Sequence, residues 1–243
     1  MWRLPHRTAN SGTTVSVLWV FGLLAMLSLP VQGWDLRGTA HDPDSGEIKY
    51  LEEHYVETDD KGIRSRRVDY LRPDGERFAR KILTHDTAYP YVPSLQWEDI
   101  EADTTIEGWL DGDTYYQTIR APGRNDEERA SLGDPDKVAF DAAFDQYLTD
   151  HFDQLLEQGR LRFDFLSLSA GRTYSFQAEV TARHDDTVVI EVGPRNTVIR
   201  WFVDPIELEY ARSAPRLIRF TGITNFRRDG DLVEADIHYE YAQ

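Results

Sequence analysis

Seven histidines are the first residues in this sequence that could do chemistry, because histidine is a common metal ligand and proton carrier. Six of them lie beyond the first 33 residues and stand singly: His41, His54, His85, His151, His184 and His238. None belongs to an H-x-H, H-x-x-x-H or H-E-x-x-H pattern, which would bring two ligands to one ion. The sequence therefore predicts no metal site.

Motifs for other catalytic chemistries are also missing from the sequence. The stretch SLSAG (Ser167 to Gly171) lacks the glycine that precedes the nucleophile in the G-x-S-x-G motif. The chain contains no cysteine, which excludes thiol catalysis. Gly108, Gly112 and Gly123 stand alone, whereas phosphate-binding loops need clustered glycines. We therefore expect neither enzymatic activity nor a cofactor.

One segment repeats its apolar residues every three to four positions, which is typical of a helix packed on one side. Asp134 can cap its start, Pro135 fits the first helical position, and Gly159 can end it. This pattern predicts a helix over about 136–158. Its apolar face holds Phe140, Phe144, Tyr147, Leu148, Phe152 and Leu155.

Two polar residues also point toward this predicted face. His151 is expected as a hydrogen-bonded core histidine, with a ligand role as the alternative. Asp141 lies near the helix start, where the helix dipole favours a carboxylate. Because ten residues, or about 15 Å of helix, separate the two side chains, they form no catalytic dyad.

Alternating apolar and polar residues before and after the helix predict β-strands. In RTYSFQAEVTAR, for example, Tyr174 and Phe176 face one way while Ser175 faces the other. Turn sequences such as DDKG and PDGE separate neighbouring strands. About five strands precede the helix and about six follow it. This spacing favours antiparallel pairing, because parallel pairs would need a helix between most strands.

Residues 1–33 differ in composition from the rest of the chain. Arg3 and Arg7 make a basic start, and Val15 to Leu29 is an apolar run shorter than the roughly 20 residues that span a bilayer. Pro30 then interrupts the run, and VQG follows. This layout predicts a cleavable secretory signal, with an uncleaved membrane anchor as the alternative. The expected location is periplasmic or secreted, in a bacterium.

The chain is strongly acidic, with a net charge of −16 over 243 residues. Removal of residues 1–33, which hold two arginines and no acidic residue, changes the net charge to −18. Such a surface repels backbone phosphates, so nucleic acid is not expected as a partner. The mean hydropathy of −0.55 excludes a polytopic membrane protein.

Three stretches, PDGERFARKIL, KVAFDAAFDQYL and DPIELEYARSAPRLIRFTGITNF, together resemble a family of exported bacterial proteins of similar length. This resemblance covers most of the mature chain and implies a single domain. At the level of fold, the signal, the many antiparallel strands and the helix also resemble the periplasmic lipoprotein carriers of the LolA/LolB type. That second resemblance implies an acyl chain bound between sheet and helix. The chain departs from those carriers in having one long central helix instead of several short ones.

The predicted fold is an α+β domain over 47–243. In it, a large curved, half-barrel-like antiparallel β-sheet of about eleven strands wraps around one long central helix. A sheet of this width must be covered on its apolar face, and the helix is the cover that the sequence offers. Residues 34–46 are expected as a polar leader, and residues 121–135 as a mobile loop.

The first functional hypothesis is a periplasmic binding or carrier protein for a hydrophobic ligand such as an acyl chain or lipid. The predicted ligand-binding residues come from the helix and from the facing strands: Phe140, Phe144, Tyr147, Leu148, Phe152, Phe163, Tyr174, Phe176 and Trp201. The alternative is a cell-envelope protein-interaction module with a filled core and no ligand. Its edge would be YPYVPSLQW, with Tyr91 and Trp97 as anchors.

Overall fold

In the computed structural model, the chain forms two compact units, Met1–Gln32 and Gly33–Gln243. The structure describes residues 33–141, 143–168, 171–196, 204–228 and 231–242. The predicted signal therefore lies outside the described residues, apart from Gly33. Among the described residues, no helix is both long enough and apolar enough to cross a membrane.

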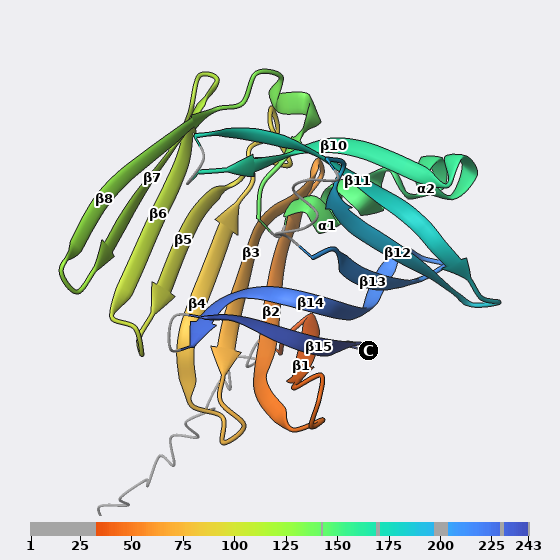
Figure 1. The fold of residues 1–243 in the computed structure, drawn as a ribbon, viewed down its shortest axis with the longest axis horizontal. Coiled ribbons are helices and arrows are strands. Elements are labelled where there is room, and N and C mark those ends of the chain that lie inside the picture. Colours follow the sequence, from red (N-terminus) through yellow and green to blue (C-terminus); the bar gives the residue numbers. More distant parts are fainter. Residues whose placement is uncertain (1–32, 142, 169–170, 197–203, 229–230, 243) are drawn as a thin grey trace, which may run out of the picture. The chain divides into compact units, whose positions relative to one another are not determined.

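Fifteen strands of the described part form one sheet (Figure 1). The first eight are β1 (Leu36–His41), β2 (Ile48–Asp59), β3 (Gly62–Leu71), β4 (Arg77–Thr84), β5 (Ser94–Asp99), β6 (Thr104–Asp111), β7 (Thr114–Ala121) and β8 (Arg124–Ser131). The other seven are β9 (Val138–Ala139), β10 (Arg160–Ser167), β11 (Arg172–Arg183), β12 (Thr187–Pro194), β13 (Ile206–Ala211), β14 (Arg216–Arg228) and β15 (Asp231–Tyr241). The helical elements are the 3-10 helix η1 (Pro135–Lys137), α1 (Ala143–Asp150) and α2 (Phe152–Gln158).

The order of the strands follows the chain in two runs. From one edge, β8 leads back to β1, which pairs with β15, and β15 leads back to β9 at the other edge. Neighbouring strands are antiparallel except β9 and β10, which are parallel, so the sheet is mixed. The two edge strands are consecutive in the chain but are not paired with each other. The sheet is therefore open.

The prediction of a sheet wrapped around one long central helix is wrong. Of the segment 136–158, Val138 and Ala139 form β9 and pair with β10. Asp141 adopts a φ of 51°, which a right-handed helix does not allow, and α1 starts only at Ala143. The helix breaks again at His151, whose φ of −110° and ψ of 20° separate α1 from α2.

The end of the predicted helix is confirmed. Gly159 has a φ of 72°, and its N–H donates to the Leu155 carbonyl at 2.9 Å. This left-handed cap is the conformation that glycine adopts most readily.

Two segments that the sequence placed outside the regular structure contain strands. Residues 34–46, expected as a polar leader, contain β1, which lies in mid-sheet between β15 and β2. Residues 121–135, expected as a mobile loop, contain β8. The alternating pattern is weak in β1 because its inward positions include the small residues Gly38 and Ala40. It is absent from β8 because this edge strand is mostly exposed, and its charges protect a sheet edge.

Two glycines of the inner face make room for tyrosine rings from neighbouring strands. A Cβ on Gly38 would lie 2.8 Å from Cε1 of Tyr239, and one on Gly108 would lie 2.6 Å from the Tyr115 hydroxyl oxygen. The Tyr115 hydroxyl donates to the Pro93 carbonyl at 3.0 Å. Each tyrosine ring can therefore pack over the neighbouring strand only because the glycine there has no side chain.

The sheet is curved, because one carboxylate contacts strands that are far apart in it. The Arg66 Nη1 of β3 lies 3.3 Å from Oδ2 of Asp145, and the Tyr210 hydroxyl of β13 donates to Oδ1 at 2.7 Å. Four strands separate β3 from β13, or about 24 Å in a flat sheet at the usual strand spacing. The inner face is therefore concave between β3 and β13.

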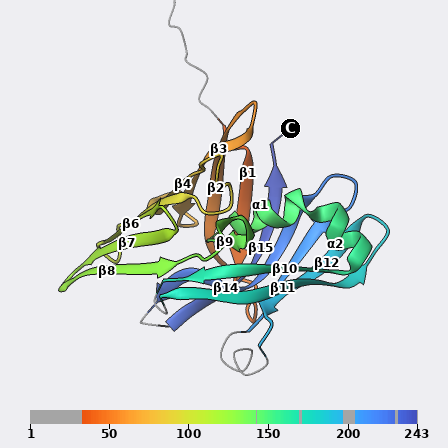
Figure 2. The same cartoon turned by 90° about the horizontal axis from the view of Figure 1, so that it is seen from above.

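Three clusters of buried residues form the core. The first joins α1 and α2 to β10–β13 and includes Leu148, Leu155, Val188, Ile190 and Leu208, which are fully buried. Figure 2 shows α2 lying along β10 and β11, with α1 leading to it from β9. The second cluster lies between β4–β8 and β9–β10, and the third is the aromatic core of β1–β4, β14 and β15. The helices thus cover one half of the inner face.

Candidate functional site

Polar residues lie buried on the inner face of β2–β7, where a purely structural core would carry apolar ones. They are Glu52, His54, Lys81 and Gln117, none more than 8% exposed. Cross-strand pairs place them on one face, because residues directly opposite each other share a side of the sheet. His54 pairs with Val68, Val68 with Lys81, and Lys81 with Trp97.

The most deeply buried charge of this face is the ammonium group of Lys81. Its Nζ lies 2.5 Å from Oδ1 of Asp141, and the two side chains are 3% and 13% exposed. Nζ also lies 5.5 Å from the centre of the Trp97 ring, within the range of a cation–π contact. Desolvation of two charges cancels much of their attraction, so such a pair stabilises a fold little in comparison with apolar packing.

The turn that follows β9 positions Asp141 opposite Lys81. The Phe140 N–H donates to the Tyr91 carbonyl at 3.0 Å, and the Phe144 N–H donates to the Asp141 carbonyl at 3.2 Å. These bonds hold Asp141 in its left-handed conformation, which aspartate tolerates better than most residues.

A cleft of about 230 Å³ opens beside this ion pair, and we call it the Lys81 cleft. Its lining combines the apolar side chains of Leu95, Trp97, Ile106 and Phe140 with the polar side chains of Lys81, Gln117 and Asp141. Ammonium, amide and carboxylate groups together offer hydrogen-bond donors and acceptors with no net charge. An apolar cleft with a few convergent polar groups is the usual form of a small-molecule site.

A second polar group on the inner face joins Glu52, His54 and Tyr239. One Glu52 oxygen, Oε2, accepts from His54 Nε2 at 3.1 Å and from the Tyr239 hydroxyl at 3.2 Å. Burial, and secondly the Glu52 carboxylate, raise the pKa of Tyr239 well above its usual value. The Nδ1 atom of His54 is buried and has no hydrogen-bond partner within the described part of the chain. None of these three residues lines the Lys81 cleft.

A third group centres on Asp145 of α1. Its carboxylate binds Arg66 and the Tyr210 hydroxyl, as described above, and burial followed by Asp145 raises the pKa of Tyr210. The group links α1 to the distant strands β3 and β13.

The structure separates the residues predicted to bind a ligand. Phe140 lines the Lys81 cleft and packs on Tyr115, with the ring centres 4.6 Å apart. Tyr147, Leu148, Phe152 and Phe163 are buried in the first core cluster, and Phe144 and Phe176 are partly buried against it. Tyr174 is partly exposed, with the Arg172 guanidinium 4.7 Å from its ring centre. Trp201 lies outside the described residues.

The two predicted anchors of an interaction edge pack against their own unit. The Tyr91 hydroxyl donates to Asp150 at 3.0 Å, and its ring meets Tyr147 edge-on at 5.0 Å. Trp97 packs against Tyr70 and Phe226, with ring centres 5.5 and 5.2 Å away, and lines the Lys81 cleft.

Sequence reasoning missed Lys81, Gln117 and Asp141 as site residues. In RFARKIL the alternation places Lys81 beside Ala79 and Leu83 on one face, and this was the available signal. A lysine between two apolar inward positions is unusual, since lysine is seldom fully buried. Asp141 carried no such signal, because the helical pattern assigned it to the start of a helix.

In comparisons with known proteins, no family model, no curated protein and no solved structure matches the chain.

Proposed function

We propose that the protein binds or carries a hydrophobic ligand, a small apolar molecule or the end of an acyl chain or lipid, in the Lys81 cleft. The observation that carries this proposal is a buried ammonium group among the mostly apolar side chains that line a cleft. A fold gains little by burying an ion pair, so its presence at an open cleft is better explained by a ligand. The compartment proposed from the sequence is periplasmic or secreted.

The size and polarity of the cleft define the ligand. At about 230 Å³ the cleft is smaller than the roughly 300–1,000 Å³ of most ligand pockets, which favours a short apolar body over a whole lipid. Since Lys81 and Asp141 neutralise each other, the polar end of the ligand should be a hydrogen-bonding group such as a hydroxyl, amide or carboxyl. The space between helices and sheet, in contrast, is filled by the first core cluster.

The alternative, an interaction module of the cell envelope, is not favoured by the contacts of its two predicted anchors. Tyr91 and Trp97 both pack inward, and an anchor residue for a partner must be accessible.

Native mass spectrometry of the protein purified from its own host should show a bound hydrophobic molecule, and a fluorescent fatty acid should bind to the delipidated protein. The variant Ile106→Phe adds a ring inside the cleft and should weaken this binding at least about tenfold, whereas Ile48→Phe on the surface should not. A clean protein that also fails to bind the fluorescent fatty acid would rule out the proposal. Equal binding by both variants would rule out the Lys81 cleft.

A further inference from the structure

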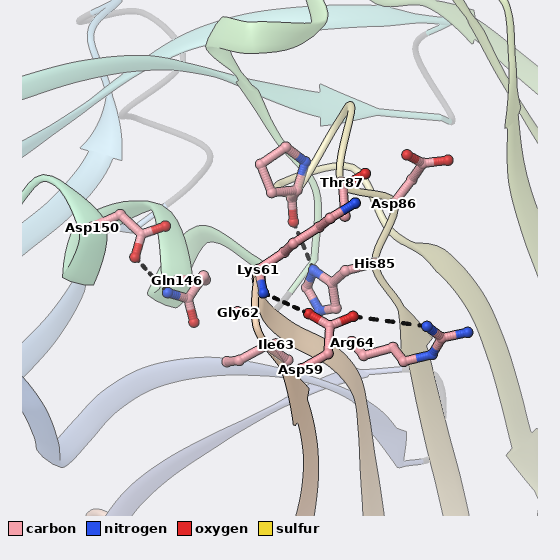
Figure 3. A pocket seen from close by; sticks show the side chains of 11 residues that line it. Asp59, Lys61, Gly62, Ile63, Arg64, His85, Asp86, Thr87, Gln146 and Asp150 are labelled. Atoms are coloured by element: carbon pink, nitrogen blue, oxygen red, sulfur yellow. Dashed lines mark hydrogen bonds and ion pairs between the residues drawn. The ribbon is translucent and has the colours of Figure 1, made fainter.

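A second pocket, of about 370 Å³, lies between the β2–β3 turn, the loop after β4 and helix α1 (Figure 3). It is larger than the Lys81 cleft and shares no lining residue with it. Most of its lining is polar or charged, and the side chains come from three segments that are far apart in the sequence. A convergence of this kind indicates a ligand different from the one proposed above.

Hydrogen bonds inside the protein fix two acceptors of this pocket. The Nδ1–H of His85 donates to the Pro90 carbonyl at 2.6 Å. Burial lowers the pKa of His85, so its ring is neutral near pH 7, and Nε2 keeps a free lone pair. The Asp150 carboxylate accepts from Gln146 at 2.6 Å and from the Tyr91 hydroxyl at 3.0 Å. A carboxylate has about four lone-pair sites, so Asp150 can still accept from a ligand.

The pocket is lined by charges of both signs. The β2–β3 turn supplies both cations, Lys61 and Arg64, and the carboxylates come from Asp59 of the same turn, Asp86 of the loop after β4 and Asp150 of α1. Asp59 partly neutralises Arg64, because their side chains approach to 3.7 Å, and it also accepts from the Lys61 N–H at 2.8 Å. Lys61 has no ion pair within the described part of the chain, so its ammonium group remains as the cationic contact of the pocket, and the carboxylates of Asp150 and Asp86 remain as anionic contacts.

We infer that this pocket binds a small zwitterion, whose anionic group contacts Lys61 and whose ammonium group donates to Asp150 and His85. A ligand with one charge only would leave either the Lys61 ammonium group or the carboxylates of the pocket uncompensated. A zwitterion satisfies groups of both signs, and its N–H donors match the fixed acceptors. Free amino acids and ethanolamine phosphate headgroups both carry this pair of groups.

Isothermal titration of the full chain tests the inference with glycine, 4-aminobutyrate and phosphoethanolamine, and with acetate and ethylamine as singly charged halves. At least one zwitterion should bind with a Kd below about 1 mM, and at least about tenfold more tightly than either half. Preference for the amino acids assigns a free metabolite, and preference for phosphoethanolamine assigns a headgroup. Binding of ethylamine or acetate as tight as that of every zwitterion would overturn the inference, as would no heat with any zwitterion.

Two substitutions in the pocket have matched controls outside it. Lys61→Met should weaken zwitterion binding at least about tenfold while leaving ethylamine binding unchanged, and Asp150→Asn should weaken both. The controls are Lys137→Met and Asp153→Asn, which change exposed residues elsewhere on the chain. Circular dichroism checks that the variants are folded. Wild-type affinity in folded Lys61→Met and Asp150→Asn would overturn the assignment of these contacts.

Discussion

On β10–β13 the inner face of the sheet meets α1 and α2 through apolar side chains, whereas on β2–β7 the same face carries buried charges and open clefts. We call these the apolar half and the polar half. Fully burying a leucine or phenylalanine contributes about 1.5–3 kcal/mol, while a buried ion pair is often no better than an apolar replacement. Buried apolar side chains of both halves hold the unit together, and the polar half keeps in addition buried polar groups that are useful for binding.

The largest expected effect lies in the apolar half. Phe152 is 4% exposed and packs on Tyr210, with ring centres 5.6 Å apart. Phe152→Ala should lower the free energy of unfolding by about 3–5 kcal/mol, because it leaves a cavity between α2 and the sheet. Urea denaturation measures the loss. Ile100→Ala, at a position 51% exposed, should change stability by no more than about 0.5 kcal/mol.

The next effect tests whether the Lys81 pair stabilises the polar half. Lys81→Met should cost about 3 kcal/mol, because it removes the ammonium group that lies 2.5 Å from the largely buried Asp141 carboxylate. The double variant Lys81→Met/Asp141→Asn should recover most of this loss, since no uncompensated charge remains. If the double variant instead loses more stability than Lys81→Met alone, the ion pair stabilises the fold as a packed core does. Lys49→Met, which breaks a partly exposed pair with Asp42, should cost less than about 1 kcal/mol.

A smaller effect is expected where the two halves meet in mid-sheet. Gly38→Ala places a methyl group against the Tyr239 ring and should cost about 1–3 kcal/mol through overpacking. Ile48→Ala, at a position 43% exposed on the neighbouring strand β2, is the control and should change stability by no more than about 0.5 kcal/mol. Equal urea midpoints for the two variants would contradict the close packing of the Tyr239 ring against Gly38 of β1.

The smallest effect concerns pH and the loop after β4. Burial lowers the pKa of His85 in the folded state below the value near 6.5 of the unfolded chain. Below about pH 6.5 the unfolded chain binds a proton that the folded protein does not, so stability falls as the pH falls. His85→Gln removes this contribution. Its urea midpoint should therefore drop less than that of the wild type between about pH 7.5 and pH 5.5. His184→Gln, an exposed control, should behave like the wild type.

Part of the fold could be predicted because local sequence determines it. The alternation in RTYSFQAEVTAR appears as β11, and the glycine of DDKG, Gly62, adopts a φ of 121° in the β2–β3 turn. The helix was predicted too long because its apolar spacing of three to four residues continues through Val138 and Ala139. Pairing of these two residues with β10 outweighs their helical pattern, and no local signal records this long-range contact.

The candidate site could be predicted only in small part. Phe140 and Trp97 were singled out as aromatic residues, but they were assigned to different hypotheses. The structure brings both to the Lys81 cleft, because the turn after β9 places Phe140 beside the strands β4–β7. Their proximity depends on contacts between segments more than forty residues apart.

By itself, the sequence determined the strand-rich composition, the acidic surface, the absence of disulfides and the glycine cap of α2, because each depends on residue type or on neighbours along the chain. The tertiary structure alone decided that β1 lies in mid-sheet, that Lys81 meets Asp141, and that His85 and Asp150 face one pocket. These features depend on which distant segments become neighbours. The physical reason is that burial and pairing free energies arise only when the curved sheet brings those segments together.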